Sequence, residues 1–262
     1  MENSEIRMSY AIYPSLKNKT VVVTGGSSGI GAEMVNAFAR QDARVHFIDI
    51  GAEDAASLQH TLAAQGLHTT FHHCDLRDVD AITTVFGRIV EADGPISVLV
   101  NNAGRDDRHD VAAVTPSDWE NCMAVNLRHQ FFCAQLAAAS MQTASQGVIL
   151  NMGSASWHVA VPSLSIYMTA KAGIEGLTRG LARDLGRHGI RVNCIVPGAV
   201  RTARQMQLWQ TPESEARLLE RQCFPERIEP RHVASMALFL ASDDAARCSG
   251  REYFVDAGYF GA

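Results

Sequence analysis

Residues 21–31 read Val21-Val22-Val23-Thr24-Gly25-Gly26-Ser27-Ser28-Gly29-Ile30-Gly31. Three consecutive β-branched residues predict a buried strand, which runs directly into a turn with glycines at positions 25, 29 and 31. Such glycines let the backbone turn tightly, approach a pyrophosphate and begin a helix whose N-terminal amides attract negative charge. An acidic residue, Asp49, follows 24 positions after Gly25 and closes the next apolar run. The segment therefore predicts a dinucleotide-binding strand, turn and helix.

Outward from this segment, short apolar runs alternate with stretches of helical length. The expected strands include residues 21–23, 45–48, 96–100, 148–150 and 190–196, and the expected helices include residues 32–41, 52–65, 78–92, 116–142 and 166–187. Nearly continuous apolar strands are typical of a parallel sheet that is covered on both faces. We predict an α/β fold with a doubly wound parallel sheet, which binds ligands at the carboxyl ends of its strands.

The chain has 262 residues and 47% hydrophobic content, which is enough for a large core. Because α/β folds of this size are commonly undivided, we expect one domain over residues 17–262, preceded by an N-terminal arm at residues 1–16. Residues 201–230 interrupt the alternation of strands and helices. We expect them to form a lid-like segment over the binding site.

Charge and targeting signals restrict the partners. The 23 basic and 28 acidic residues are interspersed and give a net charge of −5, so we expect no nucleic acid partner, which would require a basic stripe. The start of the chain lacks a basic and then apolar leader, and no apolar run approaches the ~20 residues of a membrane span. We therefore expect a cytoplasmic protein with no membrane partner.

His72, His73 and Cys74 are adjacent residues of types that bind metals. Successive side chains of a strand point to opposite faces, so these three cannot converge on one ion. We expect no metal site.

Polar and small residues close the expected strands. Asp49 could accept hydrogen bonds from an adenosine ribose and would repel a 2′-phosphate, which favours NAD over NADP, although an isolated Asp is also a common helix N-cap. Asp75 and Leu76 close the third strand, where a carboxylate and a backbone amide could meet an adenine edge. Asn101 to Gly104 close the fourth strand, with small residues that let the backbone lie against a cofactor.

Ser154, Tyr167 and Lys171 are candidate proton-transfer residues. Tyr167 and Lys171 are four positions apart, so on a helix they share one face. The ammonium can then favour the phenolate, and a Tyr base usable near neutral pH needs roughly 4 kcal/mol of such stabilisation. The Tyr-x-x-x-Lys spacing alone is also compatible with an ordinary amphipathic helix.

These motifs together resemble the short-chain dehydrogenase/reductase family. The resemblance rests on Thr-Gly-x-x-x-Gly-Ile-Gly, Asn-Asn-Ala-Gly, Ser154, Tyr-x-x-x-Lys and Pro197-Gly198, in this order, and it covers the chain from about residue 16 onward. It implies a single Rossmann-type domain with a seven-stranded parallel sheet, hydride transfer with a nicotinamide cofactor, and a homotetramer. The catalytic residues implied by the resemblance are Asn126, Ser154, Tyr167 and Lys171.

The resemblance also implies a role for each residue. Tyr167 takes a proton from a substrate hydroxyl, Ser154 steadies the substrate oxygen, and Lys171 lowers the pKa of Tyr167 and holds the nicotinamide ribose. Asn126 orders a water beside Lys171, although its amide could instead satisfy helix backbone. The expected cofactor contacts are Gly25, Ser27, Ser28, Gly29, Ile30, Gly31, Asp49, Asp75, Leu76, Asn102, Ala103, Gly104, Tyr167, Lys171, Pro197, Gly198, Val200 and Thr202.

Two polar stretches, residues 105–109 and 155–158, follow strand ends at the expected rim of the site. Paired carboxylates and imidazoles suit vicinal hydroxyls and an indole suits the face of a sugar ring, whereas a long acyl chain needs an apolar groove. A charged loop of this kind can also be a solvated turn. The expected substrate contacts are Asp106, Arg108, Ser156, Trp157, His158 and Arg204.

Further segments resemble the bacterial aldose 1-dehydrogenases of this family. These segments are residues 11–16, 106–109, 126–129, 153–158 and 252–258. The resemblance implies NAD-dependent oxidation of the anomeric hydroxyl of an aldose, such as D-xylose or L-arabinose, to the aldonolactone. Arg105 departs from the pattern and leaves the choice among sugars open. One alternative is a short-chain ketone or 3-oxoacyl reductase using NAD(P)H, which Asp49 disfavours because biosynthetic reductases usually take NADPH. Another is a non-catalytic dinucleotide-binding sensor or structural protein on the same fold, which the intact Ser, Tyr and Lys set disfavours.

Overall fold

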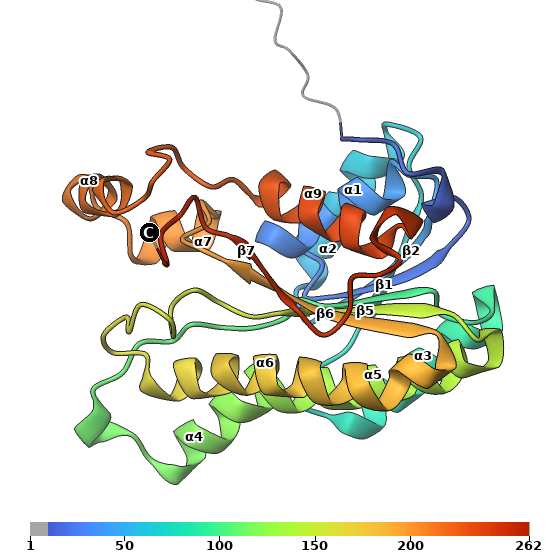
Figure 1. The fold of residues 1–262 in the computed structure, drawn as a ribbon, viewed down its shortest axis with the longest axis horizontal. Helices are drawn as coiled ribbons and strands as arrows, with labels where there is room; N and C mark the ends of the chain where they lie inside the picture. The colour runs from blue at the N-terminus through green and yellow to red at the C-terminus, as the bar shows by residue number, and fades with distance from the viewer. Residues whose placement is uncertain (1–9, 262) are drawn as a thin grey trace, which may run out of the picture.

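The computed structural model describes residues 10–261 and is built on one parallel sheet (Figure 1). The sheet has seven strands in the order β3-β2-β1-β4-β5-β6-β7. The strands are β1 (Thr20–Thr24), β2 (Arg44–Asp49), β3 (Thr69–His73), β4 (Val98–Asn101), β5 (Gly147–Met152), β6 (Ile190–Pro197) and β7 (Glu252–Val255). This architecture confirms the predicted doubly wound α/β fold of the Rossmann type.

Helices cover both faces of the sheet (Figure 1). One layer holds α1 (Gly29–Ala39), α2 (Ala52–Ala63) and α9 (Pro230–Ala241), and the other holds α3 (Val79–Asp93), α4 (Pro116–Met123), α5 (His129–Ala144) and α6 (Ser165–Leu185). The short helices α7 (Ala203–Leu208) and α8 (Pro212–Glu220) lie at one end of the molecule, beside the C-terminus. None of the helices in the described part of the chain is long and apolar enough to cross a membrane.

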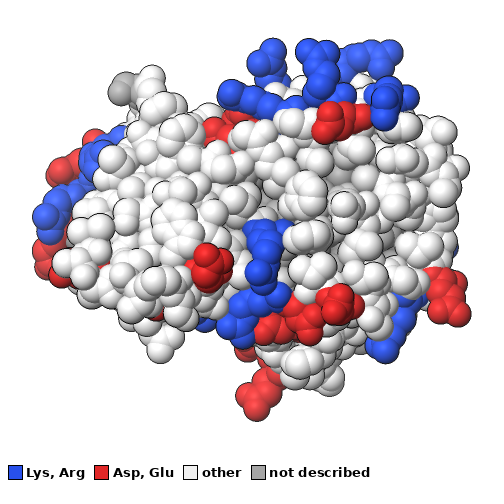
Figure 2. Space-filling view, turned by 90° about the horizontal axis from the view of Figure 1, so that it is seen from below, with Lys and Arg blue, Asp and Glu red and all other residues white. Residues whose placement is uncertain are grey.

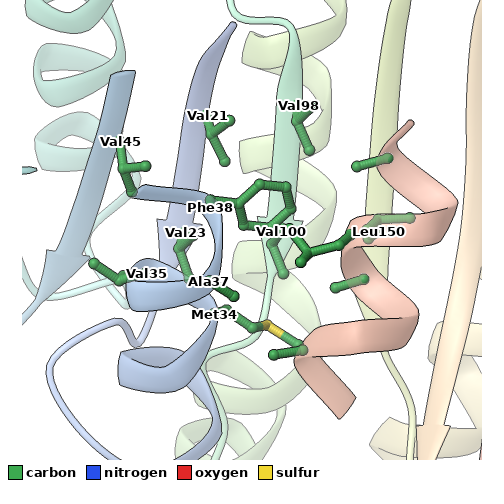
Figure 3. Packing of buried hydrophobic residues seen from close by; sticks show 14 of the residues in the cluster. Val21, Val23, Met34, Val35, Ala37, Phe38, Val45, Val98, Val100 and Leu150 are labelled. Carbon is green, nitrogen blue, oxygen red and sulfur yellow. The ribbon is translucent and has the colours of Figure 1, made fainter. Parts of the chain in front are cut away.

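The core lies on both faces of the sheet because strand side chains alternate. Val21 and Val23 belong to the cluster under α1 and α9, whereas Val22 belongs to the cluster under α3 and α5. Figure 3 shows Phe38 of α1 packed over Val21 and Val98, and all of these side chains are almost fully buried. Burial of one such side chain contributes about 1.5–3 kcal/mol, so this packing holds α1 firmly against β1.

The strand order places a crevice at the centre of the sheet. The chain builds β1, β2 and β3 outward in one direction and then crosses to β4 on the other side of β1. The loops that follow β1 and β4 diverge at this reversal, which is where parallel α/β sheets bind ligands. The glycine-rich turn after β1 therefore lies at the mouth of the crevice.

The described part of the N-terminal arm is attached to the domain. The backbone N–H of Tyr13 donates to Oε1 of Gln41 at 2.8 Å, and Nε2 of Gln41 donates to the carbonyl of Ala11 at 2.9 Å. Leu16 closes the short 3₁₀ helix η1 (Pro14–Leu16) and is 1% exposed. Residues 1–9 of the predicted arm lie outside the described residues.

Figure 2 shows the charge distribution on one face of the molecule. Lys and Arg side chains gather along one edge and in smaller groups beside Asp and Glu, with broad neutral areas between them. The charges on this face therefore form separate groups and mixed pairs.

Candidate active site

A cavity of about 580 Å³ opens at the carboxyl ends of the central strands. It brings together most of the residues that the sequence indicated. Of the predicted cofactor residues, its lining includes Gly25, Ser28, Gly29, Ile30, Gly31, Asp49, Asp75, Leu76, Asn102, Ala103, Gly104, Tyr167, Lys171, Pro197, Gly198, Val200 and Thr202. Ser154 also lines the cavity, whereas Ser27 and Asn126 lie outside this lining.

The turn after β1 forms a cradle of bare backbone. Gly25 has φ +64, and a Cβ there would lie 2.7 Å from Cα of Ala103. A Cβ on Gly31 would lie 1.9 Å from the carbonyl oxygen of Gly25, so α1 can start this close to the turn only with glycine. Nδ2 of Asn102 donates to the carbonyls of Thr24 and Gly25 at 3.0 Å each, which fastens the turn to the end of β4. This backbone fits a pyrophosphate at the start of α1.

Asp49 ends β2 and is held by four hydrogen bonds. Its Oδ2 accepts from the N–H of Ser27 at 3.0 Å and from the hydroxyl of Ser27 at 2.6 Å, and its Oδ1 accepts from the N–H groups of Ile50 and Gly51 at 2.7 and 3.1 Å. The cap of α2 is Gly51, so Asp49 is not the N-cap of this helix. Ser27 is engaged by Asp49 in this structure, and its contact with the cofactor stays a prediction.

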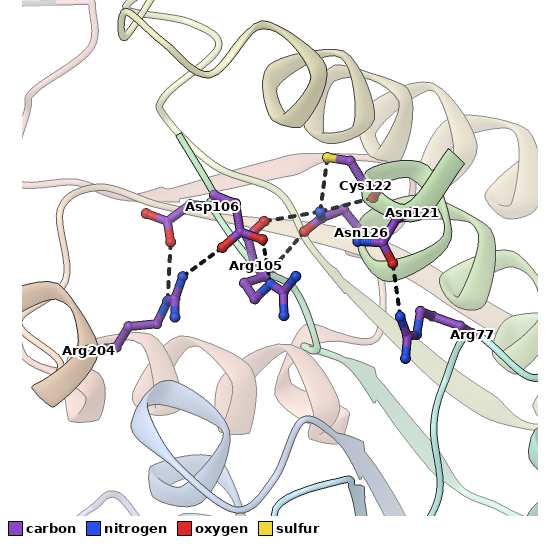
Figure 4. A network of polar contacts seen from close by, with 8 residues as sticks. Arg77, Arg105, Asp106, Asn121, Cys122, Asn126 and Arg204 are labelled. Atoms are coloured by element: carbon purple, nitrogen blue, oxygen red, sulfur yellow. Dashed lines mark hydrogen bonds and ion pairs between the residues drawn. The ribbon is translucent and has the colours of Figure 1, made fainter. Parts of the chain in front are cut away.

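Asp75 follows β3 with its carboxylate already paired. Hydrogen bonds from Arg77, with Nη2 to Oδ2 at 2.7 Å, hold the pKa of Asp75 below its usual value. Nη1 of Arg77 also donates to Oδ1 of Asn121 at 3.0 Å (Figure 4). Arg77 lines the cavity and was missed by the sequence analysis; its position two residues after a strand-ending Asp was the available signal.

Tyr167 and Lys171 lie side by side on α6, as their spacing predicts. Nζ of Lys171 is 5.6 Å from the centroid of the Tyr167 ring and donates to the carbonyl of Met152 at 2.8 Å. Ser154 Oγ lies 2.8 Å from Ser156 Oγ and accepts from the Ser156 N–H at 3.2 Å. Strand β5 and helix α6 thus place a hydroxyl, a phenol and an amine on one wall of the cavity.

Burial dominates the protonation of this pair. It raises the pKa of Tyr167 above its usual value, a rise that the hydrogen bond with Ser154 opposes and the negative charge of Asp106 adds to. Burial lowers the pKa of Lys171 to about 8. Lys171 is not among the groups that set the pKa of Tyr167 in the protein alone, so the expectation that Lys171 lowers this pKa stays a prediction for the enzyme with its cofactor. A positive charge beside the phenol would favour its ionisation.

Asn126 lies in a π-helical turn, η3 (Ala124–Arg128), between α4 and α5. Its Oδ1 accepts from the N–H of Arg105 at 2.8 Å, and its Nδ2 donates to the carbonyls of Arg105 and Cys122 at 3.1 and 3.0 Å (Figure 4). The amide thus satisfies helix backbone and also clamps the loop after β4. A Cβ on Gly104 would lie 2.9 Å from Oδ1 of Asn126 and 3.3 Å from Nζ of Lys171, so the clamped loop runs close to Lys171.

Trp157 and His158 do not line the cavity in this structure, and their contact with substrate stays a prediction. Nε1 of Trp157 donates to Oε1 of Glu175 at 2.9 Å, and Nε2 of His158 lies 2.8 Å from the same oxygen. Glu175 is 7% exposed, and a buried carboxylate requires donors. The sequence signal for this arrangement was Glu175 itself, an acidic residue one helical turn beyond Lys171 and so on the same face of α6.

The other predicted substrate residues, namely Asp106, Arg108, Ser156 and Arg204, do line the cavity. Arg204 of α7 reaches Asp107 with Nη2 at 3.0 Å. Its Nε lies 3.5 Å from Asp106 (Figure 4). The guanidinium of Arg108 lies 4.4 Å from the ring centroid of Trp209. The segment that contains α7 is thus fastened over the loop after β4 by charged and aromatic contacts.

Several lining residues carried no sequence signal of a binding role. They are apolar or come from distant segments: Val125, Val161, Leu164, Leu218 and Tyr259. Within residues 10–261, no group of three or more His, Cys, Asp or Glu side chains could hold a metal ion.

Comparison with known proteins identifies the class. A family model described as enoyl-(acyl carrier protein) reductase matches residues 25–260. A crystal structure of a protein of the short-chain alcohol dehydrogenase type from Sinorhizobium meliloti 1021 superimposes with a TM-score of 0.89 at 32% identity, covering 94% of this chain and 98% of that one. The chain belongs to the short-chain dehydrogenase/reductase family. It is an oxidoreductase of the kind that works with a nicotinamide cofactor.

Two curated relatives act on sugars by name. D-Xylose 1-dehydrogenase of Caulobacter vibrioides is 52% identical over 252 residues, which are 96% of this chain and 100% of that protein. The probable galactose dehydrogenase GalD of Rhizobium meliloti is 46% identical over 249 residues, which are 95% of this chain and 97% of that protein.

Proposed function

We propose that this protein oxidises the anomeric hydroxyl of an aldose, such as D-xylose or L-arabinose, to the aldonolactone with NAD. One observation carries the proposal: the carboxylate of Asp49 and the group Ser154, Tyr167 and Lys171 line one continuous cavity. Strands β2 and β5 are three positions apart in the sheet, which separates their ends by roughly 14 Å at the usual strand spacing. An extended dinucleotide can span that distance, from the ribose at Asp49 to a hydride acceptor beside Tyr167.

The proposed chemistry is a paired loss of a proton and a hydride from one H–C–O–H unit. When bound, NAD supplies the acceptor for the hydride and a cationic ring beside Tyr167. The phenolate Oη of Tyr167 takes the hydroxyl proton. Ser154, oriented by Ser156, donates a hydrogen bond to the substrate oxygen, and Lys171 holds the nicotinamide ribose while its ammonium is charged. Asn126 is assigned a positioning role through its clamp on Arg105.

NAD is proposed over NADP because of the charge at the end of β2. Four donors fix the carboxylate of Asp49 where an adenosine ribose would lie, and a 2′-phosphate placed there would meet a like charge. Arg77 is the nearby cation of the lining, and its guanidinium is already occupied by Asp75 and Asn121. The cofactor site of this chain therefore offers a 2′-phosphate no free partner among these residues.

A sugar suits the other end of the cavity. Asp106, Arg108, Ser156 and Arg204 supply acceptors and donors for hydroxyl groups there. The identities of 52% and 46% with relatives named for D-xylose and galactose support the same substrate class. We further propose that residues 201–230 act as a lid over the sugar, and that the protein is a cytoplasmic homotetramer. The exposed Trp119 and Phe131 on α4 and α5 are candidates for a subunit contact, which light scattering after size exclusion would test.

A substrate screen tests the proposal. D-Xylose, L-arabinose, D-galactose, L-fucose and short 3-hydroxyacyl and secondary alcohol compounds should be supplied with NAD or NADP, with Tyr167→Phe as the control enzyme. We expect reduction of NAD by one or more aldoses, dependent on Tyr167, with a lactone as the product. Activity confined to the hydroxyacyl or alcohol compounds would instead support a ketone or acyl reductase using NAD(P)H. No Tyr167-dependent reduction by any sugar would reject the aldose proposal.

A further inference from the structure

The loop after β4 carries two adjacent carboxylates with different partners. Asp107 is 55% exposed, pairs with Nε of its neighbour Arg105 and is also reached by Arg204 at 3.0 Å. Asp106 is 18% exposed and has its partners on α7: Nε of Arg204 at 3.5 Å and Nε2 of Gln205 at 2.7 Å. If α7 withdrew, Asp107 would keep Arg105, whereas Asp106 would lose both partners.

Asp106 is also the carboxylate that the catalytic pair senses. Its negative charge raises the pKa of both Tyr167 and Lys171. The clamp of Asn126 on both peptide groups of Arg105 fixes the loop in this position. The net charge beside Tyr167 and Lys171 therefore depends on whether Asp106 has a cationic partner.

The remaining titratable groups around the pair are neutral or already paired at neutral pH. Those facing it are Cys122 from α4, Cys194 from β6 and His129 from α5. Burial raises the pKa of both thiols, to about 12 for Cys194, and lowers the pKa of His129 to about 4. Glu175, one turn further along α6, is engaged by Trp157 and His158. Of the cations on the same loop, Arg105 pairs with Asp107 and Arg108 stacks on Trp209, so the ion-pair partner of Asp106 comes from α7.

We propose that Arg204 is a positioning residue that neutralises Asp106 when α7 closes, so that covering the sugar and activating the base are one event. The inference rests on the proposed function. In the arrangement that the structure shows, the guanidinium of Arg204 offsets the carboxylate of Asp106, which opposes ionisation of Tyr167. In an open arrangement Asp106 stands alone, and Tyr167 holds its proton more tightly. The enzyme would then be a poor base until substrate and lid are in place.

Lys171 gives a readout that requires no substrate. The chain contains three lysines, Lys17, Lys19 and Lys171, so NMR titration of isotope-labelled lysine side chains is simple to assign, with Lys171→Met identifying the signal. We expect Arg204→Gln to raise the pH at the midpoint of the Lys171 titration by about half a pH unit or more, because a nearby positive charge is removed. Asp106→Asn should lower it, and the double variant should return it close to the wild-type value. Arg204→Lys should preserve it.

The matched control is Arg201→Gln. Arg201 lies at the start of the same segment, is exposed and pairs with Glu229 at 3.8 Å rather than with Asp106. This variant should leave the midpoint unchanged. A midpoint that moves equally in Arg201→Gln and Arg204→Gln, or in neither, would overturn the proposal whether or not sugars are substrates. If the wild-type protein oxidised no sugar, the proposed function would be rejected, but the titration would still test the coupling between Arg204 and Asp106.

A third variant tests the link to closure. Trp209→Leu removes the stacking partner of Arg108 but leaves Arg204 chemically intact. If the position of α7 governs the charge on Asp106, the Lys171 midpoint should move in the same direction as in Arg204→Gln. For active variants, the acidic limb of the kcat/KM profile should move to higher pH in parallel. A midpoint that stays at the wild-type value in Trp209→Leu would refute the coupling to lid closure.

Discussion

The two ends of the cavity are held together by different kinds of contact. At the cofactor end, backbone meets backbone: Gly25 lies against Ala103, Gly31 against Gly25, and Asn102 ties the turn to β4. At the rim, side chains meet one another: Arg204 reaches Asp106 and Asp107, and Arg108 stacks on Trp209.

This contrast separates a rigid binding site from an adjustable one. Backbone contacts leave no room for a side chain and no alternative arrangement, so the cofactor end binds the same group in the same way. Ion pairs with exposed side chains are worth about 0–1 kcal/mol each, so the rim can open and close at little cost. We expect variants of the cofactor end to affect folding and cofactor binding, and variants of the rim to affect substrate use.

The largest effect expected is that of Tyr167→Phe. Loss of a positioned general base should lower kcat by about 10²–10⁴-fold. Cofactor affinity, measured by calorimetry, should stay within a few fold of wild type, because the cradle and Asp49 are untouched. A large loss of cofactor affinity together with the loss of kcat would show that the cofactor end and the rim of the cavity do not act independently.

Lys171 should make stability depend on alkaline pH. Its pKa is about 8 in the folded protein, whereas an unperturbed lysine has a pKa of 10.5, so between these values the unfolded chain binds the proton more tightly. Stability contributed by this group should therefore rise with pH through that window, by on the order of 3 kcal/mol relative to Lys171→Met. Urea unfolding of both proteins from pH 7 to 10.5 measures the difference. A difference that falls or stays flat would contradict the burial-lowered pKa.

Gly31→Ala should destabilise the protein by about 2–4 kcal/mol, because its Cβ would lie 1.9 Å from a backbone oxygen. Gly176→Ala is the matched control, since a Cβ at this position on α6 meets nothing within 4 Å. The control should change stability by less than about 1 kcal/mol, in the stabilising direction. Equal effects in the two variants would mean that the close contact at Gly31 does not limit the fold.

Asp49→Asn should relax the cofactor preference. Removing the negative charge should raise kcat/KM with NADP relative to NAD by about tenfold, equivalent to ~1.4 kcal/mol. Asp107→Asn removes a carboxylate at the rim and should leave this ratio unchanged. If both variants change the ratio alike, general charge rather than the end of β2 sets the preference.

The smallest effect expected is that of Trp157→Phe. Loss of the hydrogen bond to Glu175 should reduce the free energy of unfolding by about 1 kcal/mol, while KM for the sugar changes less than twofold. Ser156→Ala, which alters a side chain that lines the cavity, should change the sugar kinetics instead. A large rise of KM for the sugar in Trp157→Phe would support the prediction that Trp157 contacts substrate.

Strand and helix periodicity predicted most of the fold. Apolar runs placed β1, β2, β4, β5 and β6 within a few residues, because strands buried on both faces must be continuously apolar. The expected helix over residues 116–142 is divided into α4, a π-helical turn and α5. The turn has the same local composition as the helices beside it, so periodicity could not reveal it.

Residues at strand ends could be predicted for a similar reason. Asp49 ends β2, and Asn102 and Gly104 lie within three residues of the end of β4; a parallel sheet brings all such ends to one edge. Side chains further from a strand end were less predictable. Trp157 and Ser156 are adjacent in sequence, yet one faces the buried Glu175 and the other the cavity.

Local sequence was sufficient for features that depend on local geometry: the glycine turn, the Asp at the end of the second strand, and the i, i+4 pair of Tyr167 and Lys171. It could not fix features that depend on what lies opposite. Those are the pairing of Asp106 with Arg204 across 98 residues, the engagement of Trp157 by Glu175, and the burial that lowers the pKa of Lys171 to about 8. The physical reason is that a hydrogen-bond partner and the loss of surrounding water are properties of packing, which arise only when distant segments meet.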